Sequence, residues 1–471
     1  MTPPKPAPAE PPFRIDITLG PEDLEQLWER FDTEQDEIPA VHAVPELPPD
    51  PVPHDPIDWE YIRQMGAGLV GEVVDHYFRA RLIGAGKIPE RGPLIVAPNH
   101  SGNAFPHDAV VLDLLLWRHA GGTRAGKFRS VYTPQLAAVW WMRPYGLDNW
   151  WRRGGGVDMT FANFDRLLER GDRVIYYPEG VPGIGKGFLK RYQLQHFHSS
   201  FVALAAKHRA PVCLVSVVNA EWVNPTSVTF NWLNTFFRKV AGLPFFPVPT
   251  VFLAALFPVV FYLAFPCRMV FVVGDMVDVR KLLEEEGETD LEHPQREAVL
   301  RVAERVRRIA QERLDAAVAE HGKKPWDLRG WWKAMRKLKG RFWSRTPLGW
   351  PYAYIRHDRD RHRPPARNAL HAFLRDWDIL FYYLPLGWLG IALARALRRP
   401  PCGYRGMTRQ ARIEREGSFR WTLDTRPLPP RTVLEQASAP TYLQMAEDEA
   451  REAEAGEWTN ALLRDAADEG R

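Results

Sequence analysis

The sequence predicts an α/β fold with a mostly parallel central sheet flanked by helices, and three observations indicate it. Short β-branched or apolar runs alternate with helical stretches between residues 93 and 275. The chain of 471 residues is 45% hydrophobic, which suffices for one large core or for a core domain with appendages. Turn residues separate the runs, and Gly171 stands where a glycine ends a helix.

The expected elements follow from these runs in chain order. Buried strands are expected at Pro93–Ala97, Phe128–Tyr132, Arg173–Tyr177, Pro211–Val218 and Arg268–Val273. Helices are expected between them at Ala109–His119, Leu136–Met142, Thr160–Glu169 and Ser200–His208. A helix over Tyr61–Arg79, capped by Asp58, precedes the first strand. An amphipathic helix over Pro294–Glu320 follows the last one.

Composition divides the chain into five segments. Residues 1–55 form an acidic, proline-rich tail that we expect to be flexible, with one short helix possible at Pro21–Asp32. The α/β domain covers 56–280, and the amphipathic helix covers 281–322. Residues 323–400 are basic and rich in tryptophan, a composition that suits an anionic membrane interface. The C-terminal extension is expected to be mainly helical. Residues 401–471 form a polar tail.

Two apolar runs point to membrane association. Val240–Cys267 contains no charged residue and is long enough to span a bilayer, but its prolines argue against one straight helix. Three interpretations stay open: a buried core segment with a loop, a true span, and a hairpin or broken helix that enters one leaflet, which we favour. The second run, Ile379–Ala394, is short and is followed by arginines, which favours insertion at the interface.

Several function classes find no support in the sequence. Three cysteines lie far apart and suggest no disulfide framework, which favours a reducing compartment. The N-terminus lacks the pattern of a secretory signal. The net charge is only +4, and no nucleic-acid-binding motif accompanies the basic stretch. His196–His198 and His357–His362 lack a second cluster at ligand spacing, so we expect no metal.

The segment from Asn99 to Asp108 follows an expected strand and precedes an expected helix, where catalytic groups gather in α/β sheets. His100 is a candidate general base, since imidazole titrates near neutral pH. Asp108 could fix its tautomer, because Gly102 and Pro106 allow the loop to fold back. From spacing alone, a structural hydrogen bond between the two side chains is the more common explanation.

Two further segments carry glycine and positive charge. Tyr176–Gly187 follows a strand and is rich in glycine, which suits backbone N–H groups approaching a phosphate, with Lys186 and Arg191 nearby. Arg153 stands in a basic, glycine-rich stretch before the helix expected at Thr160. That helix N-terminus could hold a phosphate, and a plain turn explains the stretch equally well.

In this order the segments resemble the glycerophospholipid (PlsC-like) acyltransferase superfamily, over about residues 60–280. The His–Asp motif is His100 with Asp108, followed by the Pro-Glu-Gly motif at Pro178–Gly180 and by the proline-led strand at Pro211. Seven residues, 101–107, separate His100 from Asp108, more than in the most familiar family spacing. This longer loop resembles the branch of the mono- and diacylglycerol acyltransferases.

The resemblance implies transfer of a fatty acyl group from acyl-CoA, or from an acyl carrier protein, to the hydroxyl of a lysophospholipid or partial acylglycerol. His100 would be the general base and Asp108 its orienting partner. Glu179 and Gly180 would shape the acceptor site, while Lys186 or Arg191 would meet phosphates of the acceptor or donor. No cofactor is implied beyond the acyl donor, and the expected location is the cytoplasmic face of a membrane.

Other outcomes stay open at this point. The acceptor could be a sterol, an alcohol or a sugar lipid, and the sequence does not indicate an oligomeric state. The alternative from a different class is a catalytically silent protein that binds lipids or acts as a membrane scaffold. Its C-terminal extension would then carry the lipid-binding or scaffolding function.

Overall fold

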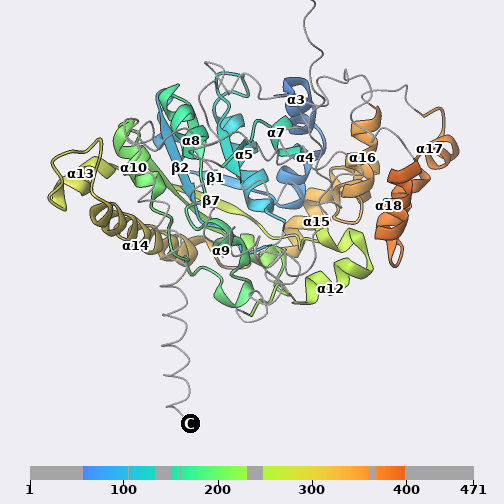
Figure 1. The fold of residues 1–471 in the computed structure, drawn as a ribbon. Coiled ribbons are helices and arrows are strands. Elements are labelled where there is room, and N and C mark those ends of the chain that lie inside the picture. The colour runs from blue at the N-terminus through green and yellow to red at the C-terminus, as the bar shows by residue number, and fades with distance from the viewer. Residues whose placement is uncertain are drawn as a thin grey trace, which may run out of the picture.

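The computed structural model describes residues 57–103, 105–132, 150–159, 161–230, 248–360 and 366–397. Five predicted features lie outside these residues: the tails 1–55 and 401–471, the helices Pro21–Asp32 and Leu136–Met142, and the start of the first apolar run at 240–247. Figure 1 shows a central sheet with helices packed on its two faces and a group of C-terminal helices beside it.

Seven strands form one sheet in the order β1-β7-β6-β2-β5-β3-β4. Their bounds are β1 Arg81–Ile83, β2 Leu94–Pro98, β3 Arg129–Tyr132, β4 Val157–Asp158, β5 Arg173–Ile175, β6 Val212–Val218 and β7 Val270–Val277. Every neighbouring pair is parallel except β6 with β7. The predicted α/β fold with a mostly parallel sheet is therefore confirmed, and each of the five expected strands is present. β1 and β4 were not predicted, because strands of 3 and 2 residues are too short to show a recognisable run of apolar or alternating residues.

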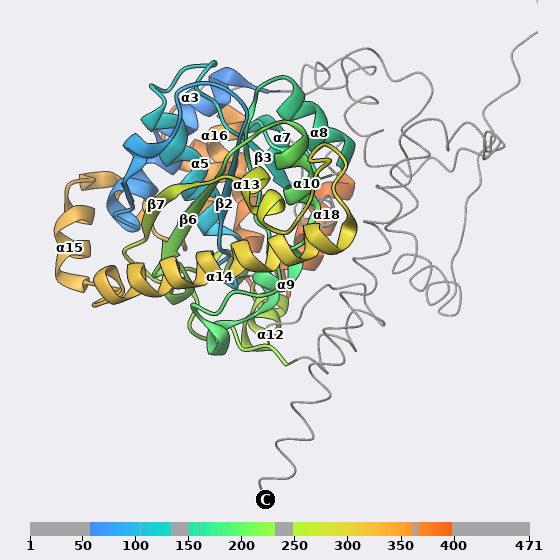
Figure 2. The same cartoon turned by 90° about the vertical axis from the view of Figure 1, so that its left-hand side faces the viewer.

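The helices expected around the sheet are also present. They are α5 His107–His119, α8 Phe161–Glu169, α10 Ser200–Lys207 and α14 Arg296–His321. Shorter helices accompany them: α7 Trp150–Arg153, α9 Gly180–Gly185 and α13 Val279–Glu285. In Figure 2, α14 runs across the sheet face as one long helix. Buried Val299, Val302 and Val306 lie on its inner side.

The helix expected over Tyr61–Arg79 is divided into three pieces. These are α3 Trp59–Ala67, α4 Leu69–Glu72 and a π-helical turn at Val73–Tyr77. Gly68 separates the first two pieces with a non-helical backbone. Asp58 caps α3 as predicted, because its carboxylate accepts the N–H of Tyr61 at 2.9 Å.

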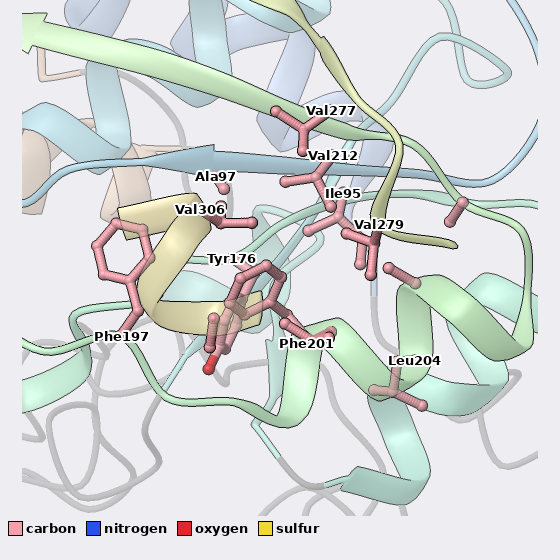
Figure 3. Packing of buried hydrophobic residues seen from close by; sticks show 14 of the residues in the cluster. Ile95, Ala97, Tyr176, Phe197, Phe201, Leu204, Val212, Val277, Val279 and Val306 are labelled. Atoms are coloured by element: carbon pink, nitrogen blue, oxygen red, sulfur yellow. The ribbon is translucent and has the colours of Figure 1, made fainter. Parts of the chain in front are cut away.

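Alternate residues of the central strands face two different cores. Ile95 and Ala97 of β2 join a cluster built with α8, α10 and α14, part of which Figure 3 shows around Phe201 and Val306. Leu94 and Val96 point the other way, into a cluster with α5 and the N-terminal helices. This period of two is the signature of a strand buried on both faces.

The C-terminal extension is helical, as predicted, within the described residues. It consists of α15 Leu328–Arg336, α16 Trp350–Asp360, α17 Ala369–Asp376 and α18 Gly387–Leu397, with short 3₁₀ turns at Lys339–Arg341, Trp343–Arg345 and Trp377–Tyr383. Trp326, Trp331 and Trp350 are partly buried against the second core. These three tryptophans therefore serve packing, whereas Trp332 and Trp343 of the same stretch are exposed.

The first apolar run is broken rather than straight. Its described part forms α12 Val248–Leu256 and a 3₁₀ helix at Pro258–Tyr262, separated by Phe257 in an extended conformation. Pro258 begins the second piece, where its missing N–H is harmless. Within the described ranges, no helix combines the length and the hydropathy needed to cross a membrane.

Candidate active site

Two asparagines fix the loop that follows β2. The side chain of Asn99 forms a pair of hydrogen bonds with Val217 of β6, accepting its N–H at 2.7 Å and donating to its carbonyl at 3.3 Å. Asn103 donates to the carbonyl of Ala220 at 3.0 Å. Both side chains are buried, so the loop between them is held against the end of the neighbouring strand.

The loop brings His100 and Asp108 together. Nδ1 of His100 lies 3.4 Å from Oδ2 of Asp108, and the backbone N–H of Ser101 donates to the same oxygen at 3.2 Å. Gly102 makes the return possible: its φ is +70°, and a Cβ there would lie 3.0 Å from the side chain of Lys186.

Asp108 stays ionised although it is fully buried. Burial alone would raise its pKa, but the hydrogen bonds from His100 and Ser101 and the nearby imidazoles outweigh it, so the pKa lies below the ordinary value. An ionised carboxylate on Nδ1 favours the tautomer that carries its proton there. The Nε2 atom of His100, which makes no hydrogen bond within the described residues, is then the basic one.

The ring of Tyr177 packs against one face of the His100 imidazole. Its ring stacks on that of His100 with centroids 3.9 Å apart and planes 14° apart. Its hydroxyl is buried and has no hydrogen-bond partner in the described part of the chain. Burial and the charges of Asp108 and Asp113 raise the pKa of this phenol, which keeps it neutral. Tyr177 had no predicted role, although it directly precedes the Pro-Glu-Gly motif.

Glu179 binds the backbone of two loops. One carboxylate oxygen accepts the N–H of His100 at 2.8 Å, and the other accepts the N–H of Gln195 at 2.8 Å. The residue is completely buried. Its predicted contact with the acceptor stays a prediction, but the geometry gives it a different task, which is to hold the backbone of the candidate base.

A buried cation and a second carboxylate complete this cluster. Nζ of Lys186 lies 3.7 Å from Glu179 and 3.8 Å from Glu221, and all three side chains are inaccessible to solvent. Burial, partly offset by Lys186, raises the pKa of Glu221 to about 7. Lys186 is thus enclosed between carboxylates, while its predicted contact with a phosphate stays a prediction.

The other three predicted site residues lie in different surroundings. Gly180 has a φ of +54° and donates its N–H to the carbonyl of Tyr177 at 3.0 Å. Arg191 is exposed and covers the ring of Phe188 at 4.8 Å, so its charge faces solvent. Arg153 is buried at 4.0 Å over the ring of Tyr61 in α3. The structure therefore groups His100, Asp108, Glu179 and Lys186, and gives Arg153 its contacts at the N-terminal helices.

An apolar cavity of about 120 Å³ lies between the N-terminal helices, α5 and α16. His107, the residue before Asp108, forms part of its wall, and burial lowers the pKa of this imidazole to about 4, so it is neutral. The other lining residues come from five separate parts of the chain: Leu69, Val70, Val73, Val74, Phe78, Phe105, Val110, Val111, Trp150, Tyr262, Trp350, Pro351 and Tyr354. No group of side chains in the described ranges has the composition of a metal site.

Residues 79–218 match the Acyltransferase family model. This match covers β1 to β6 and includes the loop of His100, the Pro-Glu-Gly motif and the proline-led strand. The chain contains an acyltransferase domain. The predicted resemblance to the glycerophospholipid acyltransferase superfamily is confirmed, while the resemblance to the mono- and diacylglycerol branch stays a prediction.

Curated relatives share the same part of the chain. Uncharacterized proteins of Mycobacterium tuberculosis and Mycobacterium leprae are each 28% identical over 177 residues, or 37% of this chain. The chain spans about half the length of these relatives, 46% and 45% respectively. A solved structure, the 1-acyl-sn-glycerophosphate acyltransferase PlsC of Thermotoga maritima, covers 63% of this chain and 97% of its own at 15% identity and a TM-score of 0.30. A TM-score this low does not by itself show a shared fold.

The acyltransferase domain should lose stability when Glu179 is replaced by glutamine. The amide would place a donor against one of the two backbone N–H groups that the carboxylate now accepts, leaving a buried donor without a partner. We expect a loss of about 1–3 kcal/mol in the free energy of unfolding, measured by urea denaturation. Glu320, whose side chain is 76% exposed, gives the matched control Glu320→Gln. If Glu179→Gln and Glu320→Gln have equal free energies of unfolding, Glu179 does not stabilise the backbone of the two loops.

The pH dependence of stability should change in Glu221→Gln. The pKa of Glu221 is raised from 4.5 to about 7, so its contribution to stability is fully present below 4.5 and is lost as the pH rises through 7. As the pH rises through these values, the melting temperature of the wild type should fall by several degrees relative to that of the variant. Glu320→Gln should keep the wild-type pH profile. A variant profile parallel to the wild type would show that Glu221 is not the titrating group.

Proposed function

We propose that the protein transfers a fatty acyl group from acyl-CoA, or from an acylated carrier protein, to the hydroxyl of a lysophospholipid or partial acylglycerol. The observation that carries this proposal is the buried pair of His100 and ionised Asp108 inside an acyltransferase domain. An apolar cavity whose wall includes His107, the neighbour of Asp108 in the sequence, fits a reaction whose two substrates are amphiphiles.

The chemistry needs one base and no covalent enzyme intermediate. Nε2 of His100 accepts the proton of the acceptor hydroxyl, and the oxygen attacks the thioester carbon. Asp108 stabilises the imidazolium that forms. The tetrahedral intermediate then breaks its C–S bond, the departing sulfur takes the proton back from His100, and an ester and a free thiol remain.

The cavity is the proposed site for part of an acyl chain. Its volume of about 120 Å³ is close to the ~150 Å³ of an apolar cavity that accepts benzene, so a short run of methylene groups fits. Neutral His107 adds no charge to its wall. Arg191, exposed near the Pro-Glu-Gly helix, is available to a phosphate of donor or acceptor. We place the reaction at the cytoplasmic face of a membrane.

Replacing His100 by alanine should abolish most acyl transfer. Loss of a general base lowers the rate by about 10²–10⁴-fold. Asp108→Asn should also lower the rate, because the ring would lose the partner that fixes its tautomer. The measurement is release of free thiol from palmitoyl-CoA with a panel of acceptors, with the lipid product identified by mass spectrometry.

The matched control is His119→Ala, an exposed histidine at the other end of α5. It should retain wild-type turnover. Turnover that survives in His100→Ala would remove the catalytic assignment. Absence of turnover in the wild type with every acceptor, alongside lipid binding, would favour the alternative of a silent lipid-binding protein.

Filling the cavity should shorten the preferred acyl chain. Val110 lines the cavity from α5, and Val110→Trp would occupy space now open to methylene groups. We expect kcat/KM for palmitoyl-CoA to fall about tenfold relative to octanoyl-CoA, since overpacking costs about 1–3 kcal/mol. His119→Trp is the control on the same helix. An unchanged chain preference in folded Val110→Trp would place the acyl chain elsewhere.

A further inference from the structure

Two apolar segments that are far apart in the sequence lie side by side. The backbone N–H of Leu386 donates to the carbonyl of Leu256 at 2.7 Å. The indole of Trp388 donates to the carbonyl of Ala254 at 2.6 Å. The end of α12 is therefore joined to the start of α18, and Figure 1 shows the two helices near each other at the edge of the molecule.

This region carries large apolar side chains in contact with solvent. On α12 they are Phe252, Leu253 and Leu256, and at α18 they are Leu386, Leu389 and Leu393. Exposure of these six side chains reaches 62% at Phe252 and 71% at Leu389. We call them the α12–α18 face. Exposed apolar patches of this kind mark sites of interaction.

The two segments that form the face carry no charge. Residues 248–267 and 379–394 contain no charged side chain. Just before the second segment, Asp376 and Asp378 are neutralised internally, since buried Arg359 binds them at 2.8 Å and 2.6 Å. In the sequence the second segment is followed directly by Arg395, with Arg398 and Arg399 close behind. An uncharged apolar segment followed by arginines in the sequence matches an anionic lipid surface rather than an ordinary protein partner.

The face is also connected to the cavity of the proposed active site. Tyr262, which follows α12, lines the cavity and belongs to one buried cluster with Ile379, Tyr382 and Ile391. Trp350 packs against the same cluster and lines the cavity from α16. One buried apolar cluster thus includes residues of α18 and of the cavity wall.

We propose that the α12–α18 face rests on an anionic lipid monolayer and delivers amphiphilic substrates to the cavity. The delivery step depends on the proposed function, whereas the docking itself does not. This location differs from the tryptophan-rich part of the extension, because Trp326 and Trp331 are packed inward. The exposed Trp332 lies on α15, which Figure 2 shows at the opposite side of the molecule from α18.

The test is sedimentation of the full chain with vesicles of phosphatidylcholine containing phosphatidylglycerol. The double variant Leu389→Asp/Leu393→Asp should bind at least about a hundredfold more weakly, because two leucines would no longer transfer apolar surface from water into lipid. Phe252→Asp tests the α12 side independently and should also weaken binding. The matched control is Trp332→Asp/Trp343→Asp, which changes two equally exposed aromatic residues at α15 and its neighbouring turn and should bind like the wild type.

Unchanged vesicle binding in the leucine variant, or loss in the tryptophan control, would overturn the proposal. So would a wild-type dimer that the leucine variant converts to a monomer while vesicle binding persists, since a second copy would then cover the face. Circular dichroism confirms that each variant is folded.

Thiol release from octanoyl-CoA without vesicles separates this proposal from the proposed function. The leucine variant should retain that activity. His100→Ala should bind vesicles normally and release no thiol.

Discussion

The carboxylate of Glu179 is the interaction on which the geometry of the candidate site depends. It accepts one backbone N–H from the loop after β2 and another from the loop before α10, so it joins two segments far apart in the sequence. A fully buried carboxylate is tolerated only when its oxygens are occupied. Lys186 supplies the opposite charge at 3.7 Å. The backbone position of His100 therefore depends on a hydrogen bond to the carboxylate of Glu179, nearly eighty residues away in the sequence.

Much of this site could be predicted from order and spacing. Parallel strands end at the same edge of a sheet, so motifs that follow strands converge there. The meeting of His100 and Asp108 was predictable because both belong to the one connection between β2 and α5, in which Gly102 allows the chain to turn back. The direction in which Glu179 points was not, because a Pro-Glu-Gly motif does not reveal whether its carboxylate faces a substrate or a backbone N–H. Tyr177 was equally hidden, since stacking on an imidazole requires the register of two strands.

The C-terminal extension shows how tertiary contacts determine which aromatic side chains are exposed. The indole of Trp326 donates to the carbonyl of Trp222 at 3.1 Å and that of Trp350 to the carbonyl of Arg345 at 3.0 Å, whereas Trp332 and Trp343 are 52% and 74% exposed. An aromatic ring with a satisfied N–H packs as well in a core as at an interface. The membrane interface predicted over 323–400 stays a prediction, because composition does not reveal which of its side chains face solvent.

The proposed function would divide the work between two parts of the molecule. Residues 79–218 contain the candidate base and its partners, whereas Trp350, Pro351 and Tyr354 of the extension form part of the wall of the apolar cavity. If the cavity holds the acyl chain, as proposed, the shape of the space for that chain depends on residues outside the family match. Two chains with the same motifs would then accept different acyl groups, because part of the wall that limits chain length belongs to a segment that the motifs do not constrain.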